Sequence, residues 1–371
     1  MMNPDRAESE CLQGFGLKDL PSRKEEIRSK KLIVGYDGFI DTTVRPIKRT
    51  ATDTAPAQTF DDIAEFGSFL TSKAGMSCSV ELEVESRHPG GNMPYLLTCA
   101  GTLGLDVTGI GMMGDGGHVD DLFSGLPGKL YSFAPSADST CMEFRDGKVL
   151  LAPSYTLKDD GWKLVMEATK NQAPAWIREA DLLALVNWSE LSFSHRLWEN
   201  TYEHTLAEAE AVADKDKYVF FDLCDIARKT DDEIRGVLEL IARFSTKRTT
   251  ILSANENEIL LLGRAVTLKT KSLEEIGREL RKQYKMDEIL IHTRMESLLI
   301  TNQGVCRKSS IFVEHPVMST GAGDHFNAAS CLAAVMRLDE EQRLEFANQV
   351  TSLYIRTGKT PSLEQAVKNQ P

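Results

Sequence analysis

The sequence has few of the residues that form covalent or metal cross-links. It contains seven cysteines among 371 residues, and none of them forms a Cys-x-x-Cys pair or joins histidines at metal-site spacing. A disulfide framework and a structural zinc site both need such patterns. We therefore expect reduced, mostly buried thiols.

Long apolar runs and an excess of basic residues are also missing. No stretch reaches the roughly 20 apolar residues of a membrane-spanning helix, and the N-terminus mixes acids with bases and lacks a signal-peptide core. The 55 acidic residues outnumber the 43 basic ones, so the net charge is −12. This balance argues against nucleic acid or a membrane surface as a partner, although a local pocket could hold a small anion. We expect a cytoplasmic protein whose residues 1–30 are an N-terminal extension, either a tail or an added helix.

What the sequence contains is an alternation of short apolar segments with amphipathic ones. Strands that alternate with helices form a mainly parallel sheet with helices on both faces, so the fold class is α/β. Ligands bind such sheets at the carboxyl ends of the strands, in the loops that lead into helices. Buried strands are predicted at residues 32–36, 181–188, 217–223, 249–255 and 287–293.

A second, smaller sheet is indicated where this alternation breaks. Residues 76–86 alternate polar and apolar side chains with period two, and residues 139–153 have the pattern of two strands joined by an Arg-Asp-Gly-Lys turn. With the stretch after Asp41, they predict a lid. Its strands would come from about 41–50, 76–88 and 130–153.

The segment Ser-Thr-Gly-Ala-Gly-Asp, residues 319–324, comes just before a helical pattern. Backbone amides at a helix N-terminus can hold an anion, and the glycines let the ligand approach closely. The residues concerned are Gly321, Ala322 and Gly323, followed by Asp324 in the first turn. The alternative is a tight connection with no function.

Two further strand ends carry polar residues. Asn255 and Glu258 are three apart on one helical face and could order water around a divalent metal, but Asn with Glu three residues later is also a helix-capping pattern. Asp37 and Asp41 follow the first strand, where carboxylates could accept hydrogen bonds from sugar hydroxyls or could simply be solvated.

A pair of glycines stands before the next predicted helix. Gly90 and Gly91 permit close approach of a ligand, and Asn92 can both donate and accept hydrogen bonds. Taken alone, such a pair is most often a turn.

The order of these features along the chain is more informative than any one of them. An acid after the first strand, Gly-Gly before a helix, period-two strands, Asn-x-x-Glu and a late Gly-Ala-Gly-Asp resemble the ribokinase-like sugar kinases, also called the PfkB family. The resemblance runs from about residue 31 to the end. It implies a single kinase domain over 31–371 with a β-sheet lid, which transfers the γ-phosphoryl group of ATP to a hydroxyl of a sugar, nucleoside or related molecule.

The resemblance also implies roles for individual residues. Asp324 matches the catalytic base and Gly321–Gly323 the anion hole, while Asn255 and Glu258 match a motif near phosphate and a Mg²⁺ ion that is held through water. Asp222 takes the place of a strand-end acid. The remaining assignments are Gly90, Gly91, Asn92, Asp37 and Asp41 for the sugar, and Thr293, Arg294 and Asn348 for the nucleotide.

The sequence departs from the family pattern at three places. Met318 stands where an acid often helps to build a monovalent-cation site, so potassium activation is doubtful. Residues 93–95 lack the family's usual Asn, which predicts an unusual substrate pocket. Arg294 replaces a glycine; its guanidinium could reach nucleotide phosphate or could be a solvated surface group.

The sequence favours an ATP-dependent kinase of a small sugar or sugar acid. A nucleoside kinase of the same fold is the nearest alternative. A non-catalytic sugar- or nucleotide-binding protein is another, although the retained Asp324 speaks against it. The apolar alternation in 79–85 permits a homodimer through the lid.

Overall fold

A nine-stranded sheet forms the centre of the molecule. The computed structural model describes residues 16–153, 155–157, 160–207 and 212–368. The strand order is β14-β13-β12-β11-β10-β9-β1-β5-β6, with parallel pairing from β6 to β12 and antiparallel pairing at β13 and β14. The strands are β1 (Lys31–Gly35), β5 (Asp106–Gly111), β6 (Lys129–Ser132), β9 (Leu182–Val186), β10 (Tyr218–Asp222), β11 (Thr249–Asn255), β12 (Glu288–His292), β13 (Glu296–Ile300) and β14 (Val305–Ser309).

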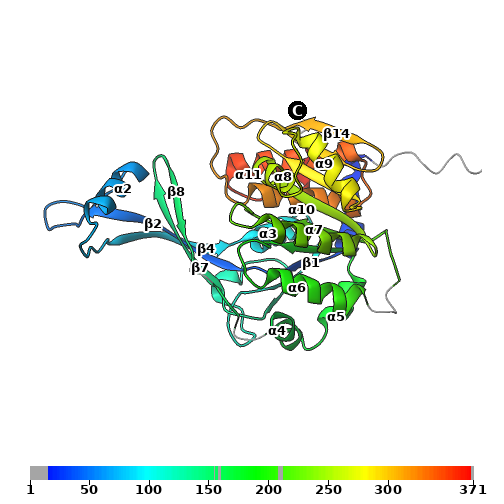
Figure 1. The fold of residues 1–371 in the computed structure, drawn as a ribbon, viewed down its shortest axis with the longest axis horizontal. Helices are drawn as coiled ribbons and strands as arrows, with labels where there is room; N and C mark the ends of the chain where they lie inside the picture. Colours follow the sequence, from blue (N-terminus) through cyan, green and yellow to red (C-terminus); the bar gives the residue numbers. More distant parts are fainter. Residues whose placement is uncertain (1–15, 154, 158–159, 208–211, 369–371) are drawn as a thin grey trace, which may run out of the picture.

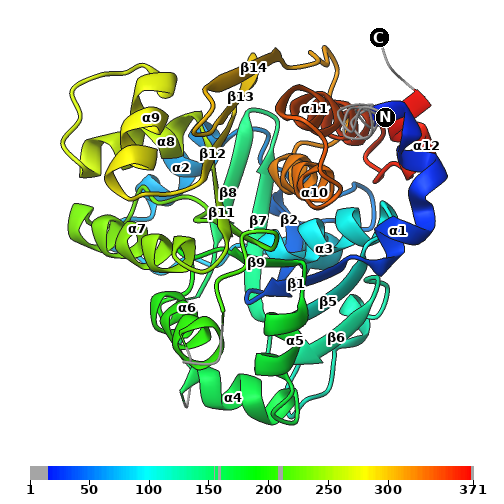
Figure 2. The ribbon, with the colours of Figure 1, turned by 90° about the vertical axis from the view of Figure 1, so that its right-hand side faces the viewer.

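Helices cover both faces of this sheet, in agreement with the alternation in the sequence (Figure 2). One face carries α1 (Lys24–Ser29), α3 (Asn92–Thr102), α10 (Ala322–Val335), α11 (Glu340–Thr357) and α12 (Leu363–Lys368). The other carries α4 (Gly161–Ala168), α5 (Ala173–Glu179), α6 (Ser194–Thr201) with the π-helical turn Tyr202–Leu206, α7 (Asp231–Ser245), α8 (Glu256–Ala265) and α9 (Leu273–Gln283). A short 3₁₀ helix, Asp121–Phe123, lies between β5 and β6.

The two hydrophobic cores explain why the strands read as continuous apolar runs. Successive side chains of a strand point to opposite faces of the sheet. In β9, Leu182 and Ala184 pack on the α10 side, whereas Leu183 and Leu185 pack on the α7 side. Because both faces are buried, polar residues inside the strands, such as Ser253, are themselves buried, and the side chains that can reach a ligand lie at the strand ends.

The second sheet, which is the expected lid, projects from the α/β body (Figure 1). Its order is β3-β2-β7-β8, and β4 pairs with β2. A small core of Val44, Phe60, Phe66 and Met142 lies within it. The elements are β2 (Phe39–Arg49), β3 (Gln58–Thr59), α2 (Ile63–Ser72), β4 (Leu82–Gly90), β7 (Ala137–Phe144) and β8 (Gly147–Leu151).

Part of one segment that the sequence assigns to the lid lies in the main sheet. The sequence predicts lid strands from about residues 130–153, but β6 pairs in parallel with β5 at the edge of the main sheet. A strand of four residues is too short for its sequence pattern to show whether one face or both faces are buried, so the pattern does not assign it to either sheet. The chain enters the lid again only at Ala137.

The N-terminal extension packs against the body where the structure describes it. A 3₁₀ helix, Leu17–Arg23, leads into α1, and Leu17, Leu20 and Ile27 are buried in the core on the α12 side. An ion pair between Lys24 and Glu364 joins this segment to α12. Residues 1–15 of the predicted extension lie outside the described residues. Within the described ranges, no helix has the length and apolarity needed to cross a membrane.

Candidate active site

The carboxyl ends of four adjacent strands bring polar residues to one edge of the sheet. Asp37 follows β1, Asn187 follows β9, Asp222 ends β10 and Asn255 ends β11. The start of α10 lies above this edge, because its residue Asn327 donates from Nδ2 to Asp222 at 2.8 Å. The sheet therefore brings close together polar residues that lie more than 200 positions apart in the sequence.

The Gly-Ala-Gly segment forms the N-terminus of α10. Gly321 is the residue before the helix and has a left-handed conformation, φ 81°, and a Cβ there would lie 2.6 Å from the ring of Tyr95. Among the described residues, the backbone N–H groups of Gly321 and Gly323 have no backbone acceptor, whereas Ala322 donates to Ser319 O at 3.1 Å and the N–H of Asp324 donates to its own carboxylate. The two free donors and the positive end of the helix dipole suit an anion.

One hydrogen bond joins the two halves of the expected site. Asn92 donates from Nδ2 to Asp324 Oδ1 at 3.0 Å, although the two residues are 232 positions apart. Asn92 begins α3 directly after the glycine pair, and Asp324 lies in the first turn of α10. The N-termini of two helices thus meet at Asp324, where an anion and a substrate hydroxyl would lie side by side.

The glycine pair allows two aspartates to approach the backbone. A Cβ at Gly90 would lie 2.1 Å from Oδ2 of Asp41, and one at Gly91 would lie 2.4 Å from Oδ2 of Asp37. Gly91 also has a positive φ of 87°. Any other residue would displace a carboxylate, so here the glycines are required by contact as well as by conformation.

Asp37 holds the start of α3. Its carboxylate accepts from the backbone of Asn92 (2.7 Å) and Met93 (2.8 Å) and from Asn187 Nδ2 (2.8 Å), and its exposed fraction is 0%. It was predicted as a substrate ligand, but it has no surface to offer a sugar in this structure. Asp41 is different: it is half-buried at the base of the lid and accepts a hydrogen bond from Ser139.

The acids at this edge share one electrostatic field. Burial raises the pKa of Asp37 and of Asp222 to about 6, and that of Glu258 to about 8. Burial, reinforced by the charges of Asp222 and Asp37, also raises the pKa of Asp324 well above its ordinary value. Because Asp222 raises the pKa of the other three acids, it lies at the centre of the group. A cation or a proton would relieve this repulsion.

The Asn-x-x-Glu pair forms a capping box at the start of α8. Asn255 Oδ1 accepts from Glu258 N at 3.0 Å, and the Glu258 carboxylate accepts from Asn255 N and Nδ2 at 2.9 and 2.6 Å. The helix-capping role, which was the alternative interpretation of this motif, is therefore observed. Among the described residues, no three His, Cys, Asp or Glu side chains are grouped as a metal-binding set.

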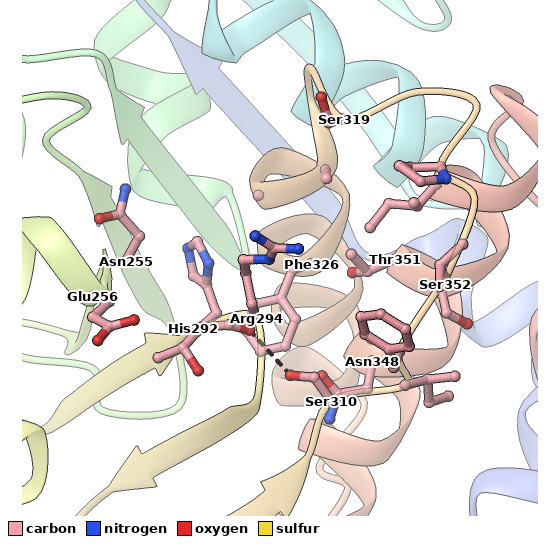
Figure 3. Close-up of a pocket in the computed structure, with 18 of the residues that line it drawn as sticks. Asn255, Glu256, His292, Arg294, Ser310, Ser319, Phe326, Asn348, Thr351 and Ser352 are labelled. Atoms are coloured by element: carbon pink, nitrogen blue, oxygen red, sulfur yellow. Dashed lines mark hydrogen bonds between the residues drawn. The ribbon is translucent and has the colours of Figure 1, made fainter. Parts of the chain in front are cut away.

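A pocket of about 590 Å³ opens beside the anion site (Figure 3). Gly323 and Ala322 form one wall, and Asn348, Thr351 and Ser352 of α11 form another. Apolar side chains complete it: Ile311, Phe312, Val313, Pro316, Phe326 and Ile355. A largely apolar pocket that ends at backbone amides suits a nucleotide, with its base among the apolar groups and its phosphates at the helix N-terminus.

The predicted nucleotide residues differ in how they meet this pocket. Arg294 is exposed, has no acidic partner among the described residues, and lies between His292 and Thr351 in the view of Figure 3. Thr293 lines the pocket, but its hydroxyl is used in a local turn, donating to Glu296 O and accepting from the N–H groups of residues 295 and 296. Asn348 donates to Ser297 Oγ at 3.0 Å.

The sequence did not single out two residues that the structure places here. Asn187 has a positive φ of 57°, is 2% exposed and leaves its Oδ1 without a hydrogen-bond partner among the described residues. His292 lines the pocket against Gly323, and burial lowers its pKa to about 4, so it is a neutral donor. Their position at the ends of predicted strands was the only sequence signal for a role in the site. A single Asn or His at a strand end forms no motif with neighbouring residues, so the sequence alone does not identify it.

The geometry agrees with the comparisons to known proteins. A family model described as prokaryotic ketohexokinase matches residues 16–369. The chain belongs to the prokaryotic ketohexokinase family. A ketohexokinase of Haloferax volcanii is 22% identical over 365 residues, covering 93% of this chain and 92% of the relative. This ketohexokinase-family protein is accordingly a carbohydrate kinase.

Solved structures confirm the ribokinase-like fold. Phosphofructokinase-2 from Escherichia coli, in complex with substrates and products, aligns with a TM-score of 0.62 at 12% identity, covering 91% of this chain and 97% of the other. Ribokinase from Arabidopsis thaliana, complexed with ribose and ATP, aligns with a TM-score of 0.58 at 17% identity and the same coverage. The ribokinase-like fold expected from the sequence is thus confirmed. The family match favours a carbohydrate kinase over a nucleoside kinase.

Proposed function

We propose that the protein transfers the γ-phosphoryl group of ATP to a hydroxyl of a ketohexose such as fructose. The family match and the relative named ketohexokinase support the acceptor class. The observation that carries the mechanism is the Asn92–Asp324 hydrogen bond, because it joins the glycine-pair loop to the free amides of α10. A base, an anion site and a polar substrate loop then meet at one point.

Asp324 is the general base in this proposal. Phosphoryl transfer needs positioning and charge stabilisation more than a strong base, since its transition state is loose. Asp324 accepts the proton of the attacking hydroxyl, while Asn92 holds the other side of the carboxyl. The N–H groups of Gly321 and Gly323 stabilise the charge on the transferring oxygens.

The sugar would lie between the base of the lid and α3. Asp41 offers a half-buried carboxylate there, whereas Asn187 is buried and holds Asp37 through its Nδ2. Asp37 contributes indirectly by fixing the start of α3 and hence Asn92. The lid would cover the sugar and exclude water, which limits hydrolysis of ATP.

The nucleotide would occupy the pocket beside α11, with Arg294 and His292 near its phosphates. Mg²⁺ fits the chemistry of this edge, because Asp222 and Glu258 supply hard oxygens and Mg²⁺ commonly keeps several waters beside one or two carboxylates. When bound with the nucleotide, Mg²⁺ neutralises phosphate charge. Asn255 fixes the orientation of the Glu258 carboxylate through the capping box.

An acceptor screen tests the proposal. Purified protein with Mg·ATP is assayed for ADP release against fructose, other ketohexoses, aldohexoses, pentoses and nucleosides, with and without potassium. We expect the highest kcat/KM for a ketohexose and no effect of potassium, with the phosphorylated position read by phosphorus NMR. Turnover confined to nucleosides, or ATP hydrolysis without phosphorylated product, would contradict the proposal.

A further inference from the structure

The loop that precedes the anion site is fastened to the end of α11. The N–H groups of Val317 and Met318 donate to Ile355 O at 2.9 and 3.2 Å. Tyr354, the preceding residue of α11, donates from its hydroxyl to Thr320 O at 2.7 Å. The loop therefore takes its position from α11 rather than from α10 alone.

His325 adds a second attachment directly after Asp324. Its Nδ1 lies 2.7 Å from Gly321 O, and its Nε2 lies 2.8 Å from the hydroxyl of Thr360. The imidazole stacks on Tyr354 with ring centroids 3.6 Å apart and planes at 15°. A carbonyl can only accept, so Nδ1 carries the proton and Nε2 accepts from Thr360. Burial lowers the pKa of His325 to about 4, which keeps this neutral form at pH 7.

These two side chains hold the peptide planes on either side of Gly321. Tyr354 binds the carbonyl of the 320–321 peptide, and the imidazole of His325 binds that of the 321–322 peptide, which also accepts from the backbone N–H of His325 at 3.0 Å. The relative orientation of the two planes is the φ and ψ of Gly321, a residue that rotates more freely than any other. In each trans peptide the N–H points opposite to the carbonyl, so fixing Thr320 O also fixes the direction of the free Gly321 N–H.

We propose that His325 and Tyr354 are positioning residues that lock Gly321 and thereby aim the anion-hole amides at the transferring phosphoryl group. The proposal rests on the function proposed above. Preorganised donors stabilise a transition state without reorganising during the reaction, and a small rotation of the loop would lose that advantage. Neither side chain needs to touch substrate.

Four variants test the clamp. His325→Leu fills the space without a donor, His325→Asn restores a donor near the position of Nδ1, and Tyr354→Phe removes only the hydroxyl. Tyr218→Phe is the matched control, because this buried tyrosine accepts from Arg337 Nη1 at 3.1 Å at the amino end of β10, away from the site.

We expect a loss of kcat with little change in either KM. Removing one anion-hole donor typically costs about 100- to 1000-fold in kcat, so misaiming the donors should cost about 10- to 100-fold in His325→Leu. His325→Asn should recover most of that loss, and Tyr354→Phe should lose several-fold. The double variant His325→Leu/Tyr354→Phe should be only slightly worse than His325→Leu, because both act on one glycine.

The binding of ADP with aluminium fluoride gives a readout that needs no sugar turnover. The fluoride complex mimics the transferring phosphoryl group, so His325→Leu should bind it about tenfold more weakly while its affinity for ADP alone stays the same. Failure of the wild-type acceptor screen would refute the proposed function and leave this comparison intact. An active wild type together with a His325→Leu variant that keeps kcat within twofold, or a His325→Asn variant no better than His325→Leu, would refute the clamp.

Discussion

Asp324 shows how a single residue takes its chemistry from its surroundings. The helix dipole favours its ionised form, whereas burial and the neighbouring acids favour its protonated form. Asn92 is the neutral partner that leaves the carboxyl able to accept a proton. The balance between these influences is set by α3, α10 and β10 together.

Replacing the base without changing its shape should separate folding from turnover. Asp324→Asn removes a charge from an acidic group, so we expect a melting temperature equal to or above that of the wild type and unchanged ATP binding. Turnover should fall by about 100- to 10,000-fold, the usual contribution of a general base. Asp339→Asn, which changes the N-cap of α11 while retaining a capping side chain, serves as the control. Turnover within a few-fold of the wild type would remove Asp324 from its proposed role.

Arg294 is the exposed cation of the nucleotide pocket. If its guanidinium binds phosphate, Arg294→Ala should raise the KM for ATP about three- to tenfold, a range that allows for solvent screening of an exposed ion pair. The KM for the sugar should not change. Arg278→Ala, which removes an exposed arginine paired with Glu274 on α9, is the matched control. An unchanged ATP KM would identify Arg294 as a solvated surface residue.

At the scale of elements, the sequence predicted what depends on periodicity and local turn chemistry. The five buried strands, the helices around them and the β7–β8 hairpin were found as expected. The placement of β6 was not, because pairing with β5 depends on a partner rather than on four residues of local pattern. The sequence did not predict Asn187 and His292 as site residues for the same reason. Both matter because of residues at neighbouring strand ends, and only the fold brings those residues close.

The lid leaves apolar side chains on its outer strands. Val84 of β4 is 59% exposed and Leu150 of β8 is 66% exposed, and Leu82 and Leu151 lie near them in the sequence. We propose a homodimer that covers the exposed face of β4, where Leu82 and Val84 point to the same side of the sheet, since exposed apolar surface commonly marks an interface. Light scattering should show a dimer that the double variant Leu82→Glu/Val84→Glu converts to a folded monomer. A wild-type monomer at micromolar concentration would contradict it.

At the scale of the whole molecule, folding gathers acids from distant parts of the chain into one buried group. Asp37, Asp222, Asp324 and Glu258 come from four elements of one sheet edge, and each of them has a raised pKa. Bringing these acids together in a buried place lowers the free energy of unfolding. We expect a protein to keep such an arrangement only where a ligand uses the site. Such local destabilisation is common where function constrains a fold.

This cost predicts how stability depends on pH. An acid whose pKa is raised on folding binds more protons in the folded than in the unfolded state, so stability falls as the pH rises between the two pKa values. With Asp37 and Asp222 at about 6 and Glu258 at about 8, the loss should extend from about pH 4 to pH 8. Asp222→Asn should therefore raise the melting temperature more at pH 8 than at pH 5.5, by about 1 °C for each ~1 kcal/mol in a protein of 371 residues. Asp53→Asn, a change in an exposed loop, should raise it at neither pH. Calorimetry without nucleotide provides the measurement, and an Asp222→Asn effect that is equal at the two pH values would show that burial does not raise the pKa of Asp222.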